Sequence, residues 1–452
     1  MKVAIVGGNA AGATAAARLR RSRPDWDILL LERGEQVSFA NCGLPYFLEG
    51  LVRERSSLFA ESAATLASKY RIEVRLRNEA VALRPSSREL TLVDLASGRR
   101  YREGYDRLLL APGASPHRPA APGMEGPGVL GLWSVPDMDE LERRIRAGAR
   151  AAAILGAGRL GCLLAEALRA RGLAVELLEA REQALWPLDP EIAEYARAEL
   201  EAKGVRLRLG ASVESVEPGP GRGVCAHLRG GGAARADFLV LCAGTRPNSR
   251  LAREAGLAIG ESGGIAVGAG LRTSDPDIYA AGDAIETTSA VTGLPAASAL
   301  AGPAQIQGRI AADNIAALRP GWEERYPGGF GSSITRLWEL RLGMTGASAG
   351  ELERAGMAFR SVLVRAPAIA PYMPGSSSIH LKLFYGLDGR VLGLHAAGGE
   401  GVDKRLDVAA TALQLGARVS DLERLQLGYS PSVGTARDAI NVAGSLALRS
   451  LR

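Results

Sequence analysis

The sequence predicts an α/β protein with two nucleotide-binding βαβ units and a C-terminal α+β unit, on three observations. A short apolar run, a glycine-rich turn and an alanine-rich stretch with helical periodicity occur in residues 2–20, and the same succession returns in residues 151–172. A second apolar run follows each time and ends in an acidic residue, in residues 27–32 and 174–179. In residues 379–416, two strand-like runs precede a helical pattern, which is typical of an α+β unit.

The composition fits a globular protein of two or three domains. The chain has 452 residues, of which 47% are apolar and 23% are charged, and it contains no apolar run long enough to span a membrane. The formal net charge of +6 comes without a long lysine or arginine block, which favours an anionic small ligand over nucleic acid. We therefore expect neither a nucleic-acid nor a membrane partner.

Cysteine and histidine usage indicates a reducing compartment and no metal site. The four cysteines are scattered without a Cys-x-x-Cys pair, and the four histidines show no metal-ligand spacing. The first residues go straight into a strand-like run, so we expect no signal peptide and a cytoplasmic location.

A second repeated pattern predicts the domain boundaries. Residues 105–119 and 236–250 each form a buried strand that runs into a glycine turn with prolines after it. We expect the chain to leave one nucleotide-binding domain for the next at these two places. The predicted domains are residues 1–114 with 245–320, an inserted second domain of residues 115–244, and a C-terminal domain of residues 321–452.

The first glycine turn predicts a Rossmann-like dinucleotide site. Gly7 and Gly12 fit the fingerprint, although Asn9 replaces its middle glycine. Glu32 ends the next strand, 20 residues after Gly12, where an acid accepts ribose hydroxyls. A pyrophosphate would lie at the N-terminus of the intervening helix, where free N–H groups and the helix dipole favour anions. The alternative is an ordinary glycine turn that packs a helix on a strand.

The second glycine turn carries the full fingerprint, formed by Gly156, Gly158 and Gly161. Glu179 ends its second strand, and a glutamate there repels the 2′-phosphate of NADPH and favours NADH. Arg181, two residues further on, favours NADPH instead. Both cofactors therefore remain open, with the balance toward NADH.

A third stretch, residues 273–286, completes the first site. Its strand ends in Asp283, whose carboxylate is placed to accept a ribityl hydroxyl of a flavin. A Gly-Asp pair at a strand end is usually structural, and it becomes specific here because it follows two nucleotide-binding units. The neighbouring residues that we also predict at the cofactors are Arg33, Ala111, Gly113 and Gly282.

The stretch SFANCGLPYF, residues 38–47, places Cys42 shortly after the first βα unit. Together with both glycine turns and Asp283, it resembles the pyridine nucleotide-disulfide oxidoreductases, and within them the branch that has one redox cysteine. The resemblance covers nearly the whole chain and implies FAD, NADH or NADPH, and a homodimer formed through a C-terminal dimerisation domain. The branch contains coenzyme A-disulfide reductases, NADH oxidases and peroxidases, and NADH-dependent persulfide reductases.

One position discriminates among these activities. The oxidases and peroxidases have a histidine where this chain has Ala10, whereas the coenzyme A-disulfide reductases have small residues there. The resemblance thus implies a reductase of a low-molecular-weight disulfide or persulfide, with coenzyme A disulfide or coenzyme A persulfide as the leading substrate. An NADH oxidase is one alternative, and a flavoprotein electron carrier or redox sensor is another.

The resemblance also implies further site residues. Tyr372 and Tyr429 match two catalytic tyrosines of the C-terminal domain in the coenzyme A-disulfide reductases, and Tyr429 is expected at the cofactor as well. Their alternative role is packing in the dimer interface. The basic residues of the first helix are alternatively a solvated face. The predicted contacts to the coenzyme A part of the substrate are Thr14, Arg18, Arg21, Ser38, Asn41 and Arg437.

The second glycine turn departs from the family at two positions. Family members usually have Gly-Tyr-x-Gly-x-Glu, in which the tyrosine lies over the flavin and the glutamate helps hold the nicotinamide. Arg159 and Leu163 stand at these two positions. They are the features that favour the carrier or sensor alternative.

Cys42 is predicted to be the redox-active thiol. A helix beginning beside it stabilises a thiolate, and electrons would pass from NADH through FAD to a mixed disulfide between Cys42 and the substrate. A single cysteine needs the substrate's own sulfur as its exchange partner. We expect Cys162 and Cys242 to be buried and inert, and Cys225 to be incidental.

Overall fold

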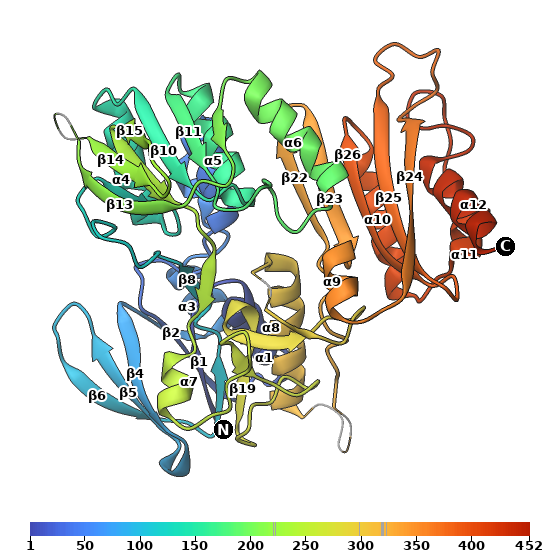
Figure 1. Ribbon diagram of the computed structural model, residues 1–452. Helices are drawn as coiled ribbons and strands as arrows, with labels where there is room; N and C mark the ends of the chain where they lie inside the picture. Colours follow the sequence, from blue (N-terminus) through green and yellow to red (C-terminus); the bar gives the residue numbers. More distant parts are fainter. Residues whose placement is uncertain (220, 222, 298, 318–320, 322) are drawn as a thin grey trace.

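Two parallel five-stranded sheets and one antiparallel five-stranded sheet organise the chain (Figure 1). The computed structural model describes residues 1–452 apart from 220, 222, 298, 318–320 and 322. Each parallel sheet has one glycine-rich turn after its central strand, at the edge where open α/β sheets bind ligands. This arrangement confirms the predicted α/β fold class with two Rossmann-like units.

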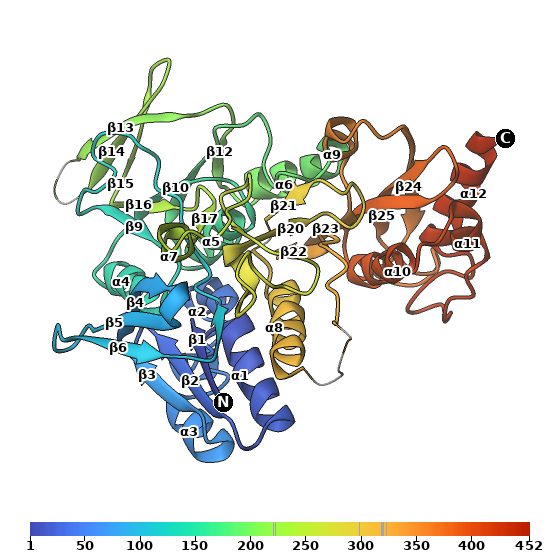
Figure 2. The ribbon, with the colours of Figure 1, turned by 90° about the horizontal axis from the view of Figure 1, so that it is seen from below.

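The first parallel sheet has the strand order β19–β7–β1–β2–β3. β19 pairs with β7 although the whole second sheet lies between them in the sequence, so the chain returns to complete the first unit. Helices α1 and α8 pack side by side in this unit (Figure 2). The elements are β1 (Lys2–Val6), β2 (Asp27–Glu32), β3 (Glu73–Leu76), β7 (Arg107–Leu110), β19 (Ile278–Ala280), α1 (Ala10–Ser22), α3 (Ala63–Tyr70), α7 (Arg250–Glu254) and α8 (Ala301–Ala316).

The second parallel sheet repeats this plan with the order β12–β11–β10–β16–β9. Its three inner strands, β11, β10 and β16, are rich in apolar residues and mostly buried, as expected for a parallel sheet covered on both faces. The elements are β9 (Val129–Gly131), β10 (Ala151–Leu155), β11 (Ala174–Leu178), β12 (Arg206–Arg208), β16 (Phe238–Leu241), α4 (Val135–Arg146), α5 (Arg159–Ala170) and α6 (Pro190–Ala202).

A two-stranded ribbon joins the two parallel units. β8 (Ala114–Pro116) leaves the first unit, and β17 (Thr245–Pro247) returns to it, so the outgoing and returning segments pair antiparallel. The predicted boundaries near residues 114 and 244 lie at this ribbon and stay predictions. The predicted boundary at residue 320 lies outside the described residues.

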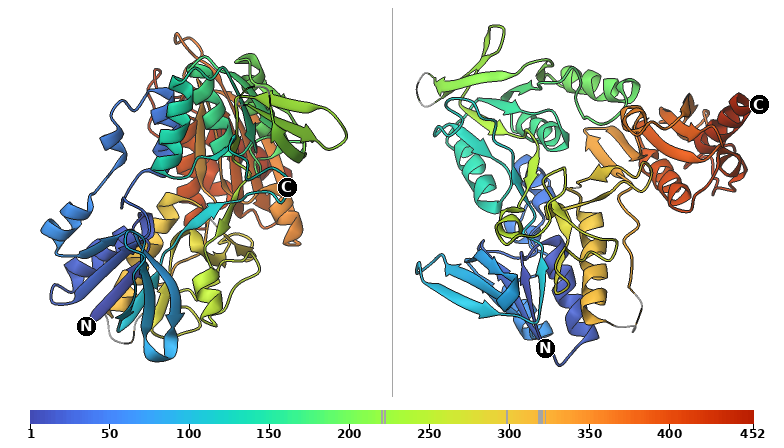
Figure 3. Two further views of the ribbon diagram at one scale, coloured as in Figure 1. Left: turned by 90° about the vertical axis from the view of Figure 1, so that its left-hand side faces the viewer. Right: turned by 60° about the horizontal axis from the view of Figure 1, so that its bottom comes forward.

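The C-terminal unit is an antiparallel sheet of order β22–β23–β26–β25–β24 with helices packed on it. Helix α10 packs on β23 and β26, and α12 packs on β24 and β25, in the part of the molecule that projects beside the other two units (Figure 3). The strands and helix expected in residues 379–416 are β25, β26 and α10. The elements are β22 (Ser333–Leu337), β23 (Leu340–Gly346), β24 (Phe359–Pro367), β25 (Ser378–Gly386), β26 (Val391–Gly398), α9 (Ala349–Arg354), α10 (Val402–Gln414), α11 (Val419–Arg424) and α12 (Ala439–Leu451).

Smaller elements complete the chain. A short helix, α2 (Leu44–Glu49), follows the segment that contains Cys42 and packs on α4 and α5 of the second unit. Within the described residues, no helix has the length and apolar character needed to cross a membrane. The remaining strands are β4 (Asn78–Arg84), β5 (Glu89–Asp94), β6 (Arg100–Gly104), β13 (Val213–Pro218), β14 (Val224–Leu228), β15 (Ala233–Ala236), β18 (Ile265–Ala266), β20 (Ile285–Thr288) and β21 (Pro295–Ala296).

Candidate active site

The first glycine turn needs glycine for steric reasons. Gly7 has a φ of +103°, and a Cβ there would lie 2.0 Å from the backbone oxygen of Ala111. A Cβ on Gly12 would lie 1.9 Å from the backbone oxygen of Gly7. The start of α1 is thereby packed against the end of β1, and the first N–H groups of α1 face the position expected for a pyrophosphate.

Glu32 lies beside this turn, as the sequence predicts. The N–H of Gly8 donates to Oε2 of Glu32 at 2.8 Å, and the N–H of Gly34 donates to Oε1 at 2.7 Å. An ionised carboxylate has about four acceptor sites. Glu32 therefore keeps the capacity to accept ribose hydroxyls while the backbone holds it in place.

Asp283 supplies a carboxyl group without a protein partner. Burial raises the pKa of Asp283 to about 6, and within the described residues no hydrogen bond or ion pair involves it. Gly282 has a φ of +79°, and its N–H donates to Oε1 of buried Gln307 on α8 at 2.9 Å. An unpartnered, partly desolvated carboxyl group beside a glycine-rich cradle fits a ligand rich in hydroxyls, such as the ribityl chain of FAD. Gln307 is not among the residues predicted from the sequence.

The second glycine turn repeats the construction of the first. A Cβ on Gly156 would lie 2.3 Å from the backbone oxygen of Cys242, and a Cβ on Gly161 would lie 1.9 Å from that of Gly156. Gly158, at the N-cap of α5, has no atom within 4 Å of its Cβ position. The turn therefore leaves open space where a dinucleotide backbone would approach.

Glu179 occupies the same place in the second turn as Glu32 does in the first. The N–H of Ala157 donates to Oε2 of Glu179 at 2.8 Å, and the N–H of Arg181 donates to Oε1 at 3.0 Å. The guanidinium of Arg181 lies 5.1 Å from the ring centroid of Trp186. An acid and a cation thus both stand at the adenosine end of this site, so NADH and NADPH both remain open.

Arg159 and Leu163 lie on the first turns of α5. Desolvation by the surrounding protein lowers the pKa of Arg159, although its side chain keeps contact with solvent. Within the described residues, the guanidinium has no ion-pair partner. Leu163 is half-buried and packs against the core of the second unit. The helix start therefore presents a cation without a neutralising acid.

Cys42 lies in the 3₁₀ turn Asn41–Gly43, directly before α2. Its thiol is exposed, whereas Cys162 and Cys225 are buried and Cys242 is half-buried. The segment that carries it is tied to the first glycine turn, because the N–H of Ser38 donates to the backbone oxygen of Gly8 at 2.9 Å. The structure therefore brings the predicted redox cysteine to the predicted FAD site.

A buried polar group that the sequence analysis missed lies behind α2. Glu166 of α5 is 4% exposed, and its Oε1 accepts the N–H of Trp338 at 2.8 Å. Burial is the main cause that raises the pKa of Glu166, and burial also raises the pKa of Tyr46 on α2. The helix after Cys42 is thus held where all three units meet.

The predicted substrate contacts fall into two groups. Thr14, Arg18 and Arg21 lie on α1, and Ser38 and Asn41 lie in the cysteine-containing segment. Arg18 forms two hydrogen bonds with Asp313 of α8, at 2.6 and 2.9 Å. Arg21 is exposed. Arg18 is therefore committed to an internal ion pair, and Arg21 is the more accessible cation of the two.

The second group lies on the C-terminal unit. Tyr372 and Tyr429 are 74% and 50% exposed, and the neighbouring hydroxyl of Tyr372 raises the pKa of Tyr429. Arg437 is exposed, just before α12. No hydrogen bond or ion pair among the described residues joins these three to the Cys42 segment. Within one subunit, the structure does not bring them to the thiol.

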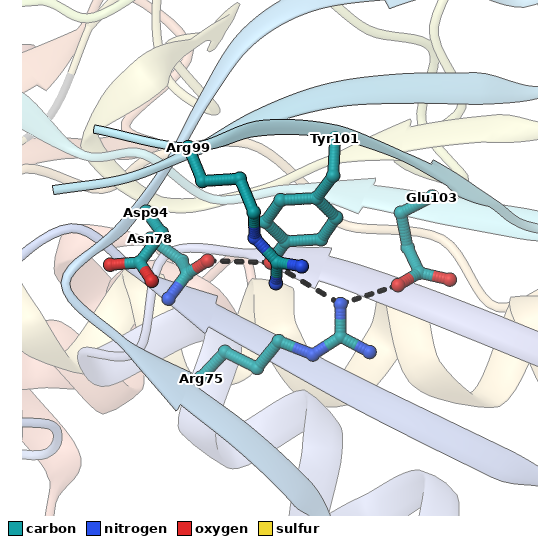
Figure 4. Close-up of a pocket in the computed structure, with 6 residues that line it drawn as sticks. All are labelled: Arg75, Asn78, Asp94, Arg99, Tyr101 and Glu103. Atoms are coloured by element: carbon teal, nitrogen blue, oxygen red, sulfur yellow. Dashed lines mark hydrogen bonds and ion pairs between the residues drawn. The ribbon is translucent and has the colours of Figure 1, made fainter. Parts of the chain in front are cut away.

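A surface hollow of the first unit lies apart from both glycine turns (Figure 4). Arg75 pairs with Glu103, and the hydroxyl of Tyr101 donates to Oδ1 of Asn78 at 2.5 Å. The ion pair joins β3 to β6, and the hydrogen bond joins β6 to β4, so these contacts have a structural role. The residues that line it are Arg75, Asn78, Asp94, Arg99, Tyr101 and Glu103.

Comparison with curated proteins finds relatives along the whole chain. An NADH oxidase of Methanocaldococcus jannaschii is 29% identical over 100% of this chain and 99% of its own length. A coenzyme A disulfide reductase of Staphylococcus haemolyticus is 28% identical over 98% of both chains. A CoA-dependent NAD(P)H sulfur oxidoreductase of Pyrococcus furiosus is 32% identical over 98% of both chains.

Solved structures show the same fold. The reduced CoADR-RHD of Bacillus anthracis matches with a TM-score of 0.96 and 36% identity, over 100% of this chain and 80% of that one. An NAD-dependent persulfide reductase of A. fulgidus matches with a TM-score of 0.95 and 33% identity, over 100% of this chain and 83% of that one.

The family model for pyridine nucleotide-disulphide oxidoreductases matches residues 1–307. This range includes both glycine turns, Cys42 and Asp283. The roles of the individual site residues stay predictions. The chain therefore belongs to the pyridine nucleotide-disulphide oxidoreductases, which confirms the predicted family of flavoprotein reductases with FAD and NAD(P)H as cofactors.

Proposed function

We propose that this protein passes electrons from NAD(P)H through FAD and Cys42 to coenzyme A disulfide or coenzyme A persulfide. The observation that carries the proposal is the exposed thiol of Cys42 on a segment hydrogen-bonded to the first glycine turn. The names of relatives of equal length support the substrate class, because two of them act on coenzyme A disulfide or depend on coenzyme A.

The chemistry needs only one cysteine of the protein. The Cys42 thiolate attacks one sulfur of the disulfide, forms a mixed disulfide and releases the other half as a thiolate. Two electrons then cleave the mixed disulfide, which regenerates the Cys42 thiolate and releases the second thiol. When bound, FAD supplies the two-electron relay from NAD(P)H. Overall, one disulfide, one NAD(P)H and one proton give two thiols and NAD(P)⁺.

The substrate-binding part of the proposal rests on exposed basic residues. Arg21 on α1 and Arg437 before α12 are exposed and are free to form charge-assisted hydrogen bonds with phosphates. Arg18 contributes mainly through its pairing with Asp313. An anionic substrate such as coenzyme A disulfide fits this surface better than a small neutral disulfide.

The active form in this proposal is a homodimer in which the C-terminal unit of one subunit completes the site of the other. The Tyr372–Tyr429 pair is exposed in the single chain, as expected for groups that act in a partner's site. The proposed domain division is the predicted one, with its C-terminal part as the dimerisation domain. A reducing cytoplasm is the proposed location, because the four scattered cysteines suggest no disulfide framework.

One relative carries the name NADH oxidase, and this makes oxygen reduction a second candidate. Ala10 has no side-chain group that donates a proton to peroxide. We therefore place oxygen reduction below disulfide reduction. Oxygen consumption in the presence of NADH, measured with and without coenzyme A disulfide, separates the two activities.

The decisive experiment uses the purified protein without oxygen. We expect a yellow protein with one FAD per chain, whose flavin absorbance is bleached by NADH or NADPH and returns when coenzyme A disulfide is added. Intact-mass analysis should show a coenzyme A adduct on Cys42 that a reductant removes. A flavin that neither nicotinamide reduces would contradict the enzyme assignment and favour the electron carrier or redox sensor.

A further inference from the structure

We propose that Asn9 is a positioning residue that holds the segment of Cys42 against the first glycine turn. Asn9 replaces the middle glycine of the fingerprint and precedes α1 with extended backbone angles, φ −97° and ψ −154°. Asparagine at this position usually accepts an N–H of its own helix. Here it makes no such cap, and its Oδ1 accepts the N–H of Phe39 at 3.1 Å instead.

Two successive N–H groups of residues 38–43, the cysteine segment, therefore bind the glycine turn. The N–H of Ser38 donates to the backbone oxygen of Gly8 at 2.9 Å, next to the bond between Phe39 and Asn9. Ser38 has a φ of +52°, which is uncommon for a residue other than glycine. The turn and the segment thus impose a specific local conformation just ahead of the thiol.

The far side of the cysteine segment is held by backbone bonds alone. The N–H of Ala60 donates to the oxygen of Ser38 at 2.9 Å, and the N–H of Ala40 donates to the oxygen of Leu58 at 2.7 Å. These bonds do not depend on the identity of any side chain. Loss of the Asn9 amide therefore removes one specific tie and leaves the rest of the segment anchored.

The hydrogen bond between Asn9 and Phe39 has two consequences for the site. Because Asn9 does not cap α1, the first N–H groups of α1 stay available for an anion. Because its Oδ1 accepts the N–H of Phe39, the same residue also fixes the position of the cysteine segment relative to that anion site. The position of the thiol is thereby coupled to the turn that holds FAD. The inference rests on the proposed function in taking Cys42 as the reacting thiol.

The test compares Asn9→Leu, which removes the acceptor at similar size, with Asn9→Asp, which keeps an oxygen acceptor. The control is Ser62→Ala, because Ser62 caps α3 of the same unit with a 3.0 Å bond to the N–H of Thr65. Each protein is first reduced and freed of reductant, so that Cys42 is a free thiol. The rate of Cys42 alkylation by iodoacetamide is then measured by mass spectrometry across pH, with and without FAD. FAD content and melting temperature are recorded alongside.

We expect Asn9→Leu to change the alkylation rate of Cys42 by about three- to tenfold in both forms, the range for one lost hydrogen bond. Because Asn9 belongs to the turn proposed to hold FAD, rates are compared between samples of equal FAD content and between FAD-free samples. Asn9→Asp should restore the alkylation rate, and Ser62→Ala should leave it unchanged. An Asn9→Leu rate within about twofold of wild type would overturn the inference. So would a change that appears only because FAD is lost, or one that Ser62→Ala reproduces.

A separate measurement tests the proposed function, so the two failures can be told apart. If Cys42→Ser still reduces coenzyme A disulfide, then Cys42 is not the reacting thiol and the proposed function is wrong. The alkylation rates of the Asn9 variants would still report whether Asn9 positions the cysteine segment.

Discussion

Cys42 differs from the other cysteines in the environment that the fold gives to its thiol. Burial raises the pKa of Cys242 to about 12 and that of Cys162 further still, so both stay protonated and unreactive. Cys42 is exposed and lies directly before α2. Accessibility therefore distinguishes Cys42, the proposed reacting thiol, from the other three cysteines.

Replacement of Cys42 by serine should abolish disulfide reduction and leave FAD binding intact. Serine is nearly the same size, but its hydroxyl is a far weaker nucleophile than a thiolate. Turnover of coenzyme A disulfide and FAD content per chain check the two halves of this expectation. Wild-type turnover by the serine variant would contradict the single-cysteine mechanism.

Asp283 should make the FAD-free protein less stable as the pH rises. Its pKa moves from 3.8 to about 6 on folding, so between pH 4 and 6 the folded state binds more protons than the unfolded state. Stability therefore falls as the pH rises through this window. Asp283→Asn should stabilise the FAD-free protein at pH 8 by roughly 1 to 3 kcal/mol, at about 1.4 kcal/mol per pKa unit.

Thermal melts at pH 4 and pH 8 check this prediction. The gain should be smaller at pH 4, where the carboxyl group is neutral in the folded state and pays no penalty for a buried charge. The same variant should lose FAD more readily, because a neutral amide is a weaker acceptor than a carboxylate. An equal gain at both pH values would show that burial of the charge is not its cause.

At the scale of elements, the contact between α1 and α8 fixes the first site. A Cβ on Gly308 would lie 2.3 Å from the backbone oxygen of Ala11, so the two helices approach closely enough for backbone contact. Arg18 and Asp313 join the same helices by two hydrogen bonds. Arg18 is therefore part of the scaffold, and its sequence neighbour Arg21 is the better probe of substrate charge.

Arg18→Ala and Arg21→Ala should separate stability from substrate binding. Arg18→Ala leaves Asp313, whose side chain is 7% exposed, with only the longer 3.8 Å contact to Arg309. It should cost about 1 to 2 kcal/mol of unfolding free energy, which chemical denaturation measures. Arg21→Ala should leave stability unchanged and raise the KM for coenzyme A disulfide more than the KM for a small uncharged disulfide. Equal effects on both substrates would contradict a phosphate contact.

The start of α5 should limit the affinity for the nicotinamide cofactor. Arg159 is flexible and charged, and Leu163 has no acceptor for a carboxamide. Arg159→Tyr with Leu163→Glu should lower the KM for NADH by up to about tenfold, the effect of one added hydrogen bond, and leave the KM for the disulfide unchanged. A low-micromolar KM in the wild type, or weaker binding by the double variant, would identify Arg159 as a cofactor contact.

For the whole molecule, a buried ion pair holds the loops that carry the two tyrosines. Arg405 is 1% exposed and bonds Asp438 at 2.7 and 3.2 Å and the backbone oxygen of Ala368 at 2.9 Å. Asp438 follows the loop of Tyr429, and Ala368 precedes the loop of Tyr372. The pair therefore presents both tyrosines on one exposed surface of the C-terminal unit.

A mixed dimer should show that this surface serves the other subunit. One subunit would carry Cys42→Ser and the other Tyr372→Phe with Tyr429→Phe, co-expressed with different tags. We expect little turnover from either variant homodimer and about half of the wild-type turnover from the mixed dimer, because a two-fold dimer has two equivalent sites. A mixed dimer as inactive as both parents would mean that the tyrosines act within their own subunit.

The sequence alone predicted the family, both glycine turns, the acids that follow them and the place of Cys42 beside the start of a helix. These features are local, because steric demands at a turn and a strand that ends in an acid both leave a pattern within about 30 residues. Gly7 and Gly12 illustrate this, since any side chain there would overlap neighbouring backbone atoms.

Tertiary structure alone decided how these local features are held together. Arg18 pairs with Asp313 across 295 residues, and Glu166 accepts the N–H of Trp338 across 172. Gln307 of α8 accepts the N–H of Gly282. Even the closer tie between Asn9 and Phe39 reverses the usual role of an N-cap residue. No spacing in the sequence encodes such contacts, because each depends on which surfaces the packed units bring within hydrogen-bond distance.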